Sequence, residues 1–195
     1  MKLTPKILKA INFASKKHKK GVRKGDKGLP YISHCFATAW ILNSFTKDED
    51  VIVAGLLHDV IEDVLGPKGY KILQEKFGQR VVDIVKGVTE DKDPNKKEDE
   101  KPWIERKQDY LDHLKKDSKE SMMVSTADKI HNLQSMRDAY REQGEKLWKN
   151  FNSPADKKLW FYEEVYKIVK GKLRNKIVEE LNKQIKGAKY EFHLY

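Results

Sequence analysis

The spacing of apolar residues constrains the fold of this chain more than any other feature. Apolar side chains recur at steps of three and four residues through most of the 195 residues, as in Ile7, Leu8, Ile11 and Ala14. This period is typical of helices that bury one face. No segment alternates apolar and polar residues over the length of a strand, and no internal repeat is visible. The pattern therefore predicts an all-α fold, a compact bundle of several helices.

Caps, glycines and prolines indicate where the helices begin and end. Thr4 and Pro5 are expected to start the first helix, which runs to about Lys19. A charged segment, 90–102, shows no apolar period and is expected to be a mobile loop. Residues 190–195 are expected to form a short extended tail. Further helices are expected from 31, after Asp48, over 70–77, 80–88, 103–114 and 121–140, and in one long segment from 154 towards 181.

Length and composition favour one domain with a real core. A chain of 195 residues lies within the usual range for a single domain, and 38% of its residues are hydrophobic. We expect one domain over 1–195, with its core at about 5–181 and a C-terminal tail at 182–195. No apolar run is long enough to span a bilayer, and the N-terminus lacks a signal-peptide core, so we expect a soluble, cytoplasmic protein without membrane contact. The single cysteine, Cys35, excludes an internal disulfide.

The net charge of +10 is confined to one part of the chain. Residues 1–47 hold eleven basic residues and one acidic residue, Asp26, which leaves 29 basic and 29 acidic residues to the rest. Such a segment could attract a polyanion, or it could be an ordinary solvated surface. Its lysines are not interleaved with aromatic residues and carry no known nucleic-acid motif, so a nucleic-acid partner is disfavoured.

Two polar pairs lie four residues apart at the end of an apolar helix. His58-Asp59 is followed by Glu62-Asp63, so that His58 and Glu62 share one helix face, as do Asp59 and Asp63. An imidazole beside a carboxylate is a ready ligand pair for a divalent metal, and the second pair could carry protons. A solvated helix end is the alternative interpretation for Glu62 and Asp63.

Two further polar residues lie among apolar neighbours on other helices. His34 lies near the start of the second expected helix, and Asp128 lies within the segment 125–133. Taken singly, each is more often a structural residue with a satisfied hydrogen bond. Together with His58-Asp59 they form a His, His-Asp, Asp order on three helices. His131, in the same segment as Asp128, is expected by its spacing to face elsewhere.

This order resembles the HD superfamily of metal-dependent phosphohydrolases. The resemblance is closest to the hydrolase domain of RelA/SpoT-type proteins and the small alarmone hydrolases, and it extends over about 14–162. The matching segments are Arg23-Lys24, Pro30-Tyr31-Ile32-Ser33-His34, Leu56-Leu57-His58-Asp59-Val60-Ile61-Glu62-Asp63, Gly87-Val88-Thr89 and Ala127-Asp128-Lys129-Ile130-His131-Asn132-Leu133.

The resemblance implies an HD-domain bundle that removes the 3′-pyrophosphate of guanosine tetra- or pentaphosphate with a bound Mn²⁺. Glu62 and Asp63 would then position or deprotonate water, or protonate the leaving oxygen. The implied ligands of the cation, for which another divalent metal is an alternative, are His34, His58, Asp59 and Asp128. The implied substrate residues are Arg23, Lys24, Asn132, Lys92 and Lys157, with Arg106 and Lys107 as weaker phosphate candidates.

Two departures from the family pattern leave other functions open. Val64 stands where alarmone hydrolases usually have Thr, and Lys20-Gly21 replaces their usual Gly-Gln. Both positions lie near the implied nucleotide pocket. The alternatives are another HD phosphohydrolase, acting on a nucleoside monophosphate, a dNTP or the 2′-phosphate of NADPH, or a non-catalytic module that binds a nucleotide or RNA. The sequence makes no prediction of the oligomeric state.

Overall fold

The chain folds into helices joined by short loops. The structure is a computed structural model that describes residues 2–23, 28–90 and 102–194. Within these ranges the only pairing of extended backbone is a single antiparallel bridge between Val22 and Pro30. The elements are α1 (Pro5–Lys17), α2 (Ile32–Phe45), α3 (Glu49–Val60), the π-helical turn η1 (Ile61–Leu65), α4 (Gly69–Phe77), α5 (Gln79–Val88), α6 (Trp103–Leu114), α7 (Lys119–Gln143), the 3₁₀ segment η2 (Gly144–Asn150), α8 (Ala155–Lys172) and α9 (Ile177–Glu191).

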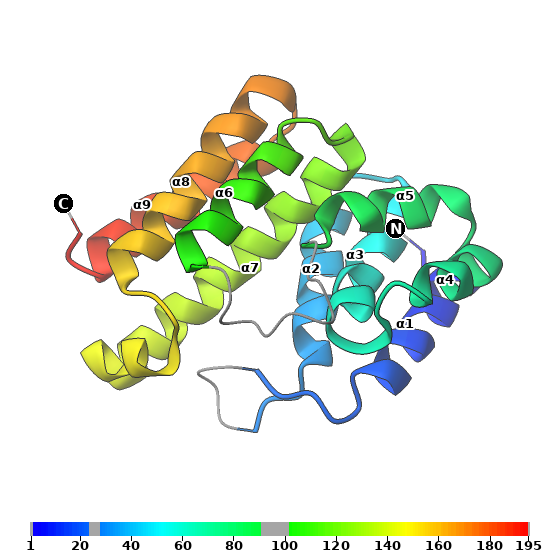
Figure 1. Ribbon diagram of the computed structural model, residues 1–195, viewed down its shortest axis with the longest axis horizontal. Coiled ribbons are helices and arrows are strands. Elements are labelled where there is room, and N and C mark those ends of the chain that lie inside the picture. The colour runs from blue at the N-terminus through cyan, green and yellow to red at the C-terminus, as the bar shows by residue number, and fades with distance from the viewer. Residues whose placement is uncertain (1, 24–27, 91–101, 195) are drawn as a thin grey trace.

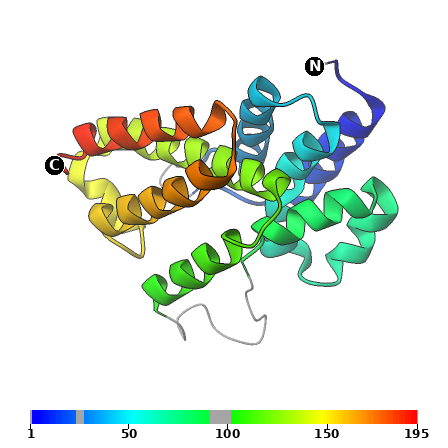
Figure 2. The ribbon, with the colours of Figure 1, turned by 90° about the horizontal axis from the view of Figure 1, so that it is seen from above.

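The helices form two groups joined by α7 and α2. Figures 1 and 2 show α1, α3, α4 and α5 on one side of the molecule and α6, α8 and α9 on the other. The 25-residue α7 runs between the groups and packs against α2, α3, α5, α8 and α9. The two ends of the chain lie at opposite sides in both views. Helix α7 therefore connects the two halves of the fold, and α2 and α3 meet it where the halves join.

Local sequence explains where the first helices begin. The Thr4 side chain accepts a hydrogen bond from the Ile7 amide at 3.2 Å, and Pro5 occupies the first helical position. The Asp48 carboxylate accepts from the Asp50 amide at 3.1 Å and caps α3 in the same way. Helix α3 is buried on nearly all sides, which explains its continuous apolar sequence. The predicted all-α bundle is confirmed for the described residues, and the expected helix starts are correct within two residues.

The single long helix expected from 154 towards 181 is wrong, because this segment forms two helices. The chain leaves α8 after Lys172 and enters α9 at Ile177. The Asn175 side chain accepts from the Ile177 amide at 3.0 Å and donates to the Phe45 carbonyl at 3.1 Å. These bonds take the place of the backbone hydrogen bonds of a continuous helix, and they attach the turn to the end of α2. A contact this distant along the chain leaves no periodic signal in the sequence.

The C-terminal segment is not a tail. Residues 182–191 belong to α9, whose Gln184, Ile185 and Ala188 are buried. Phe192 follows the helix and is also buried, against the rings of Tyr140 and Trp148. The expected extended tail and the core limit at 181 are therefore wrong. One hydrophobic cluster extends from Ile7 to Phe192.

The structure bears only in part on the expected location of the protein and on the expected loop at 90–102. None of the helices in the described ranges has the length and apolar character needed to cross a membrane. The cytoplasmic location stays a prediction. Most of the expected mobile loop, 91–101, lies outside the described residues.

Candidate metal centre

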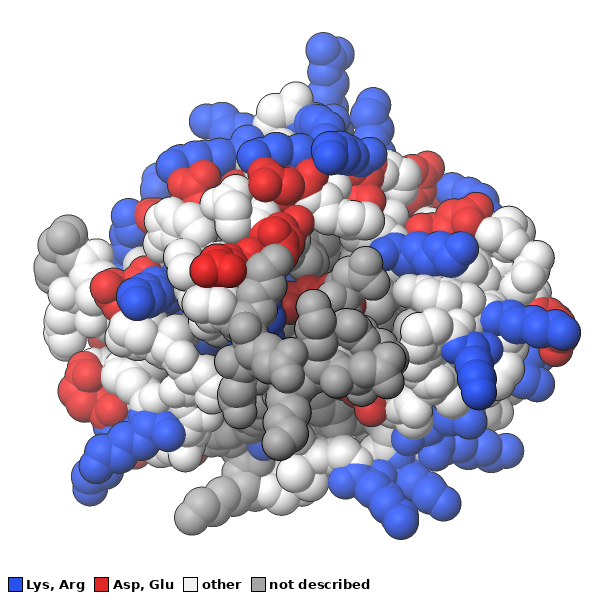
Figure 3. Space-filling model, in the orientation of Figure 1, with Lys and Arg blue, Asp and Glu red and all other residues white. Residues whose placement is uncertain are grey.

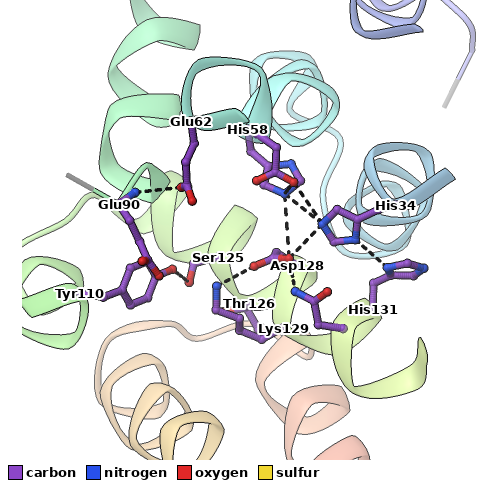
Figure 4. A network of polar contacts seen from close by, with 12 residues as sticks. His34, His58, Glu62, Glu90, Tyr110, Ser125, Thr126, Asp128, Lys129 and His131 are labelled. Atoms are coloured by element: carbon purple, nitrogen blue, oxygen red, sulfur yellow. Dashed lines mark hydrogen bonds and ion pairs between the residues drawn. The ribbon is translucent and has the colours of Figure 1, made fainter. Parts of the chain in front are cut away.

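Three helices bring the four predicted ligands to one point (Figure 4). His34 lies in the first turn of α2, His58 and Asp59 lie in the last turn of α3, and Asp128 lies in α7. His34 Nε2 is 3.2 Å from His58 Nε2 and 3.1 Å from Asp128 Oδ1. Asp59 Oδ2 is 3.0 Å from His58 Nε2 and 3.4 Å from His34 Nε2. The donor atoms of all four side chains therefore face a common centre.

Hydrogen bonds behind the two imidazoles orient them. His58 Nδ1 lies 2.8 Å from the Gly55 carbonyl, which can only accept, so Nδ1 carries a proton and Nε2 is the nitrogen available to a cation. His34 Nδ1 lies 2.7 Å from His131 Nδ1. His131 thus faces His34, and the expectation that it faces elsewhere is wrong. Its three-residue spacing from Asp128 keeps it on the side of α7 that meets α2.

Neighbouring side chains also hold the two carboxylates by hydrogen bonds. The Tyr31 hydroxyl donates to Asp59 Oδ2 at 2.6 Å. Lys129 Nζ lies 2.6 Å from Asp128 Oδ2, and the Asn132 amide donates to Asp128 Oδ1. Such bonds fix the direction in which each carboxylate presents its oxygens.

The charges of these groups favour a cation at the centre. Burial opposes protonation of His58, but the carboxylates of Asp59 and Asp128 outweigh it and raise the pKa of His58 to about 9. Burial also opposes ionisation of Asp128, yet Lys129 and the hydrogen bond from His34 keep its pKa well below the usual range. The ligand carboxylates thus stabilise a positive charge on His58, while Lys129 and His34 stabilise the negative charge of Asp128.

The donor set fits a divalent metal ion. The facing atoms of His34, His58 and Asp59 all lie within 4.8 Å of one another, and Asp128 Oδ1 lies 3.1 Å and 3.9 Å from the two imidazole Nε2 atoms. Two imidazoles with two carboxylates suit a borderline divalent ion and leave coordination positions open for water or substrate. These four residues could therefore hold such an ion.

The cluster opens into a cavity of about 170 Å³. Glu62, in the π-helical turn that directly follows α3, lines this cavity and accepts from the Glu90 amide at 3.1 Å. Turns of this kind often occur at functional sites. The cavity is lined by Arg23, Tyr31, His34, His58, Asp59, Glu62, Val88, Glu90, Lys107, Tyr110, Ser125, Asp128, Lys129 and Asn132.

Arg23 and Asn132 both line the cavity. The Arg23 guanidinium donates to Asn132 Oδ1 at 2.8 Å and lies 5.6 Å from the centre of the Tyr31 ring. Because Asn132 also bonds Asp128, a chain of contacts connects the guanidinium to the metal-ligand cluster. A planar cation on an aromatic face is well suited to contact a base or a phosphate.

Two lysines that lie over aromatic rings also line the cavity. Lys129 Nζ lies 4.7 Å from the centre of the Tyr110 ring, and Lys107 Nζ lies 5.0 Å from that of Phe161. Burial would lower the pKa of Lys129, but Asp128 and the other groups around it raise it well above the usual range. Lys107 is paired with Glu90. The cavity is thus lined by three cationic side chains, those of Arg23, Lys107 and Lys129. Figure 3 shows one face of the molecule, with Lys and Arg around most of its outline and Asp and Glu scattered among them.

The structure does not bring every predicted site residue to the cavity. Asp63 and Lys157 are exposed and are not among the residues that line it. Lys24 and Lys92 lie outside the described residues. Sequence reasoning assigned no site role to His131, Lys129 or Tyr31, although all three lie within the segments that carry the resemblance. Lys129 directly follows a predicted ligand, and Tyr31 and His131 each lie three residues from one.

Comparison with known proteins agrees with this geometry. Guanosine-3′,5′-bis(diphosphate) 3′-pyrophosphohydrolase MESH1 of Danio rerio is 36% identical over 135 residues, which cover 68% of this chain and 70% of that protein. The protein of the same name from Homo sapiens is 33% identical over 132 residues, or 67% and 69% of the two chains. A solved structure described as a metazoan ortholog of SpoT that hydrolyses ppGpp matches with a TM-score of 0.76 and 23% identity, covering 96% of this chain and 97% of its own, and it supports the fold. The HD domain family model matches residues 10–153, and the chain therefore belongs to the HD domain family.

Proposed function

We propose that this protein is a metal-dependent hydrolase that removes the 3′-pyrophosphate of guanosine tetra- or pentaphosphate and releases GDP or GTP. The observation that carries the proposal is the convergence of His34, His58, Asp59 and Asp128 in a cavity that Arg23, Lys107 and Lys129 also line. The names of the relatives from Danio rerio and Homo sapiens support the same substrate.

The four convergent side chains are the proposed ligands of the cation, and Mn²⁺ is the proposed ion. Two neutral imidazoles and two carboxylates suit a borderline divalent ion, although another divalent metal would fit the same donors. When bound, such an ion lowers the pKa of a coordinated water and polarises a phosphoryl oxygen. Tyr31 and Lys129 keep the ligand carboxylates in place through their hydrogen bonds to Asp59 and Asp128.

Glu62 is the proposed proton carrier. Its side chain lines the cavity beside the ligand cluster, and the Glu90 amide donates to it and restrains it. From this position the carboxylate can orient the attacking water, accept its proton and return a proton to the leaving ribose oxygen. The exposed Asp63 is the proposed second carboxylate, which exchanges protons with solvent.

The cationic side chains that line the cavity are the proposed contacts for the nucleotide. In this proposal Arg23, which bonds Asn132, contacts the guanine or its ribose, and Lys107 and Lys129, which line the cavity, contact phosphate oxygens. Lys24, Lys92 and Lys157 remain proposed substrate residues on the resemblance alone. A guanosine substrate with phosphate groups at both the 5′ and the 3′ position of the ribose would contact several of these cationic side chains.

A nucleotide panel tests the proposal. The Mn²⁺-loaded protein is incubated separately with ppGpp, pppGpp, a nucleoside monophosphate, a dNTP and NADPH, and the released pyrophosphate and orthophosphate are quantified. Pyrophosphate from the guanosine substrates is the expected result. Orthophosphate from a monophosphate or from NADPH alone would favour a different HD phosphohydrolase, and no turnover at all would contradict an enzyme. His58→Ala, prepared identically, controls for contaminating phosphatases.

A further inference from the structure

We propose that His131 is a positioning residue for the metal centre: its Nδ1 accepts a hydrogen bond from His34 Nδ1 and so directs His34 Nε2 at the cation. The inference rests on the proposed metal site. His131 does not line the cavity, so it has no direct contact with substrate in this proposal.

The geometry places His131 directly behind His34. The two Nδ1 atoms are 2.7 Å apart, and the ring centres are 4.9 Å apart at an angle of 45° (Figure 4). On the opposite edge of the same His34 ring, Nε2 faces the ligand atoms of His58 and Asp128 at 3.2 Å and 3.1 Å. One edge of His34 therefore belongs to the ligand cluster and the other to His131.

The direction of this hydrogen bond follows from metal coordination. A neutral imidazole that binds a cation through Nε2 must carry its proton on Nδ1. His34 Nδ1 is then the donor, so His131 Nδ1 must be bare and the His131 proton must reside on Nε2. His58 has the same arrangement, with the Gly55 carbonyl as its acceptor.

The two acceptors differ in one respect. A carbonyl can only accept, so His58 keeps a proton on Nδ1 whether or not a cation is bound. An imidazole can donate or accept, so the bond between His131 and His34 can run in either direction. Without a cation, His34 Nε2 could donate its own proton to Asp128 Oδ1, 3.1 Å away, and His131 would then donate to His34. Cation binding should therefore select one tautomer of the pair.

Metal affinity tests the positioning role without any measurement of turnover. The Mn²⁺ dissociation constants of the wild type, His131→Ala and His131→Asn are measured by titration calorimetry. Loss of such a supporting hydrogen bond typically weakens metal binding by about 10- to 100-fold, so a rise of about that size is expected for His131→Ala. The amide oxygen of His131→Asn can accept the same bond, and near wild-type affinity is expected. His113→Ala, an exposed histidine replaced in the same way, should bind as the wild type does.

The tautomer is observed directly in the wild-type protein. With ¹⁵N-labelled histidine and diamagnetic Zn²⁺, nuclear magnetic resonance should show His34 protonated on Nδ1 and His131 protonated on Nε2. A metal-loaded protein with the His131 proton on Nδ1 would overturn the inference. Unchanged Mn²⁺ affinity in His131→Ala would do the same, as would equal losses in the Ala and Asn variants, since these indicate packing rather than hydrogen bonding.

The same measurements separate this inference from the proposed site. If the wild type and His131→Ala bind Mn²⁺ equally while His58→Ala does not bind it, the positioning role fails and the metal centre stands. If the wild type binds no Mn²⁺, or His58→Ala binds it as tightly as the wild type, the proposed centre fails and the role of His131 fails with it.

Discussion

Arg23 and Asn132 are 109 residues apart in sequence, and the Arg23 guanidinium donates a 2.8 Å hydrogen bond to the Asn132 side-chain oxygen. The loop before α2 is thereby joined to α7 beside the ligand Asp128, which Asn132 also contacts. Two consecutive hydrogen bonds thus connect Arg23, a proposed nucleotide contact, to Asp128 in the proposed metal centre.

Replacement of this guanidinium should weaken nucleotide binding. Arg23→Ala is expected to raise KM for ppGpp by about tenfold or more, because a hydrogen bond to a charged group is worth about 1.5 to 3 kcal/mol. Steady-state kinetics would measure the change. The exposed Arg174→Ala, between α8 and α9, is the control and should leave KM near the wild-type value at physiological salt. An unaltered KM in Arg23→Ala would remove Arg23 from the nucleotide site.

Neutralisation of a ligand carboxylate should abolish metal retention and turnover together. Asp59→Asn keeps the shape of the side chain and can still accept from Tyr31, but it removes a charge from the centre of the cluster. Metal content after dialysis and the initial rate with ppGpp are measured on one preparation. Asp83→Asn, on the exposed face of α5, should leave both values unchanged. Full activity in metal-free Asp59→Asn would contradict the mechanism.

Glu62→Gln should separate metal binding from chemistry. The amide keeps an acceptor for the Glu90 N–H but cannot take up a proton. We expect normal Mn²⁺ content and a kcat lowered by about 10²-fold or more, as is usual when a general acid or base is lost. The exposed Glu75→Gln is the matched control. A normal kcat in Glu62→Gln would indicate that Glu62 only shapes the turn after α3.

Two glycines near the ends of helices should respond oppositely to replacement by alanine. A Cβ on Gly87 in α5 would lie 2.7 Å from Ser121 Cβ, so Gly87→Ala should lower the free energy of unfolding by about 1 to 3 kcal/mol. Gly171 in α8 has no neighbouring atom within 4 Å of such a Cβ, so Gly171→Ala should raise stability by up to about 1 kcal/mol. Denaturant unfolding of both variants is the measurement. Equal effects would contradict the close approach of α5 and α7.

Acid should weaken the contact that joins α7 to the end of α9. Arg137 and Arg141 both donate to Glu191 at 2.6 Å, and the bond from Arg137 is the main cause of a lowered Glu191 pKa. A lowered carboxyl pKa contributes stability above the unfolded value of about 4.3, and this contribution is lost as pH falls through the lower folded value.

Glu191→Gln should therefore reduce Tm at pH 7 by about 2 to 4 °C, which corresponds to about 1 kcal/mol in a chain of this size. The difference from the wild type should shrink as pH falls below about 4. Thermal unfolding between pH 7 and pH 3 measures it, with the exposed Glu179→Gln as control. A difference that is constant over this range would contradict a role for the charge.

The local sequence is enough to predict the helices, and it shows the order of the ligand residues along the chain. Apolar spacing predicts the helices because residues three and four apart lie on the same face of a helix, and that face is buried when its residues are apolar. The segment around His58-Asp59 predicts a ligand pair for a similar reason, because both residues lie in one turn of α3. His34 and Asp128 could be added only through the order of residues along the chain.

Tertiary structure decided which other side chains face the cluster. A three-residue spacing from Asp128 limits His131 to one side of α7, but only the packing of α2 on α7 decides that His34 lies opposite it. The exposed position of Lys157 and the bond from Asn175 to the Phe45 carbonyl likewise depend on how whole helices pack. Sequence by itself therefore determined the helices and their polar positions, while packing determined the partners, because contacts between distant segments exist only after the helices have assembled around a common core.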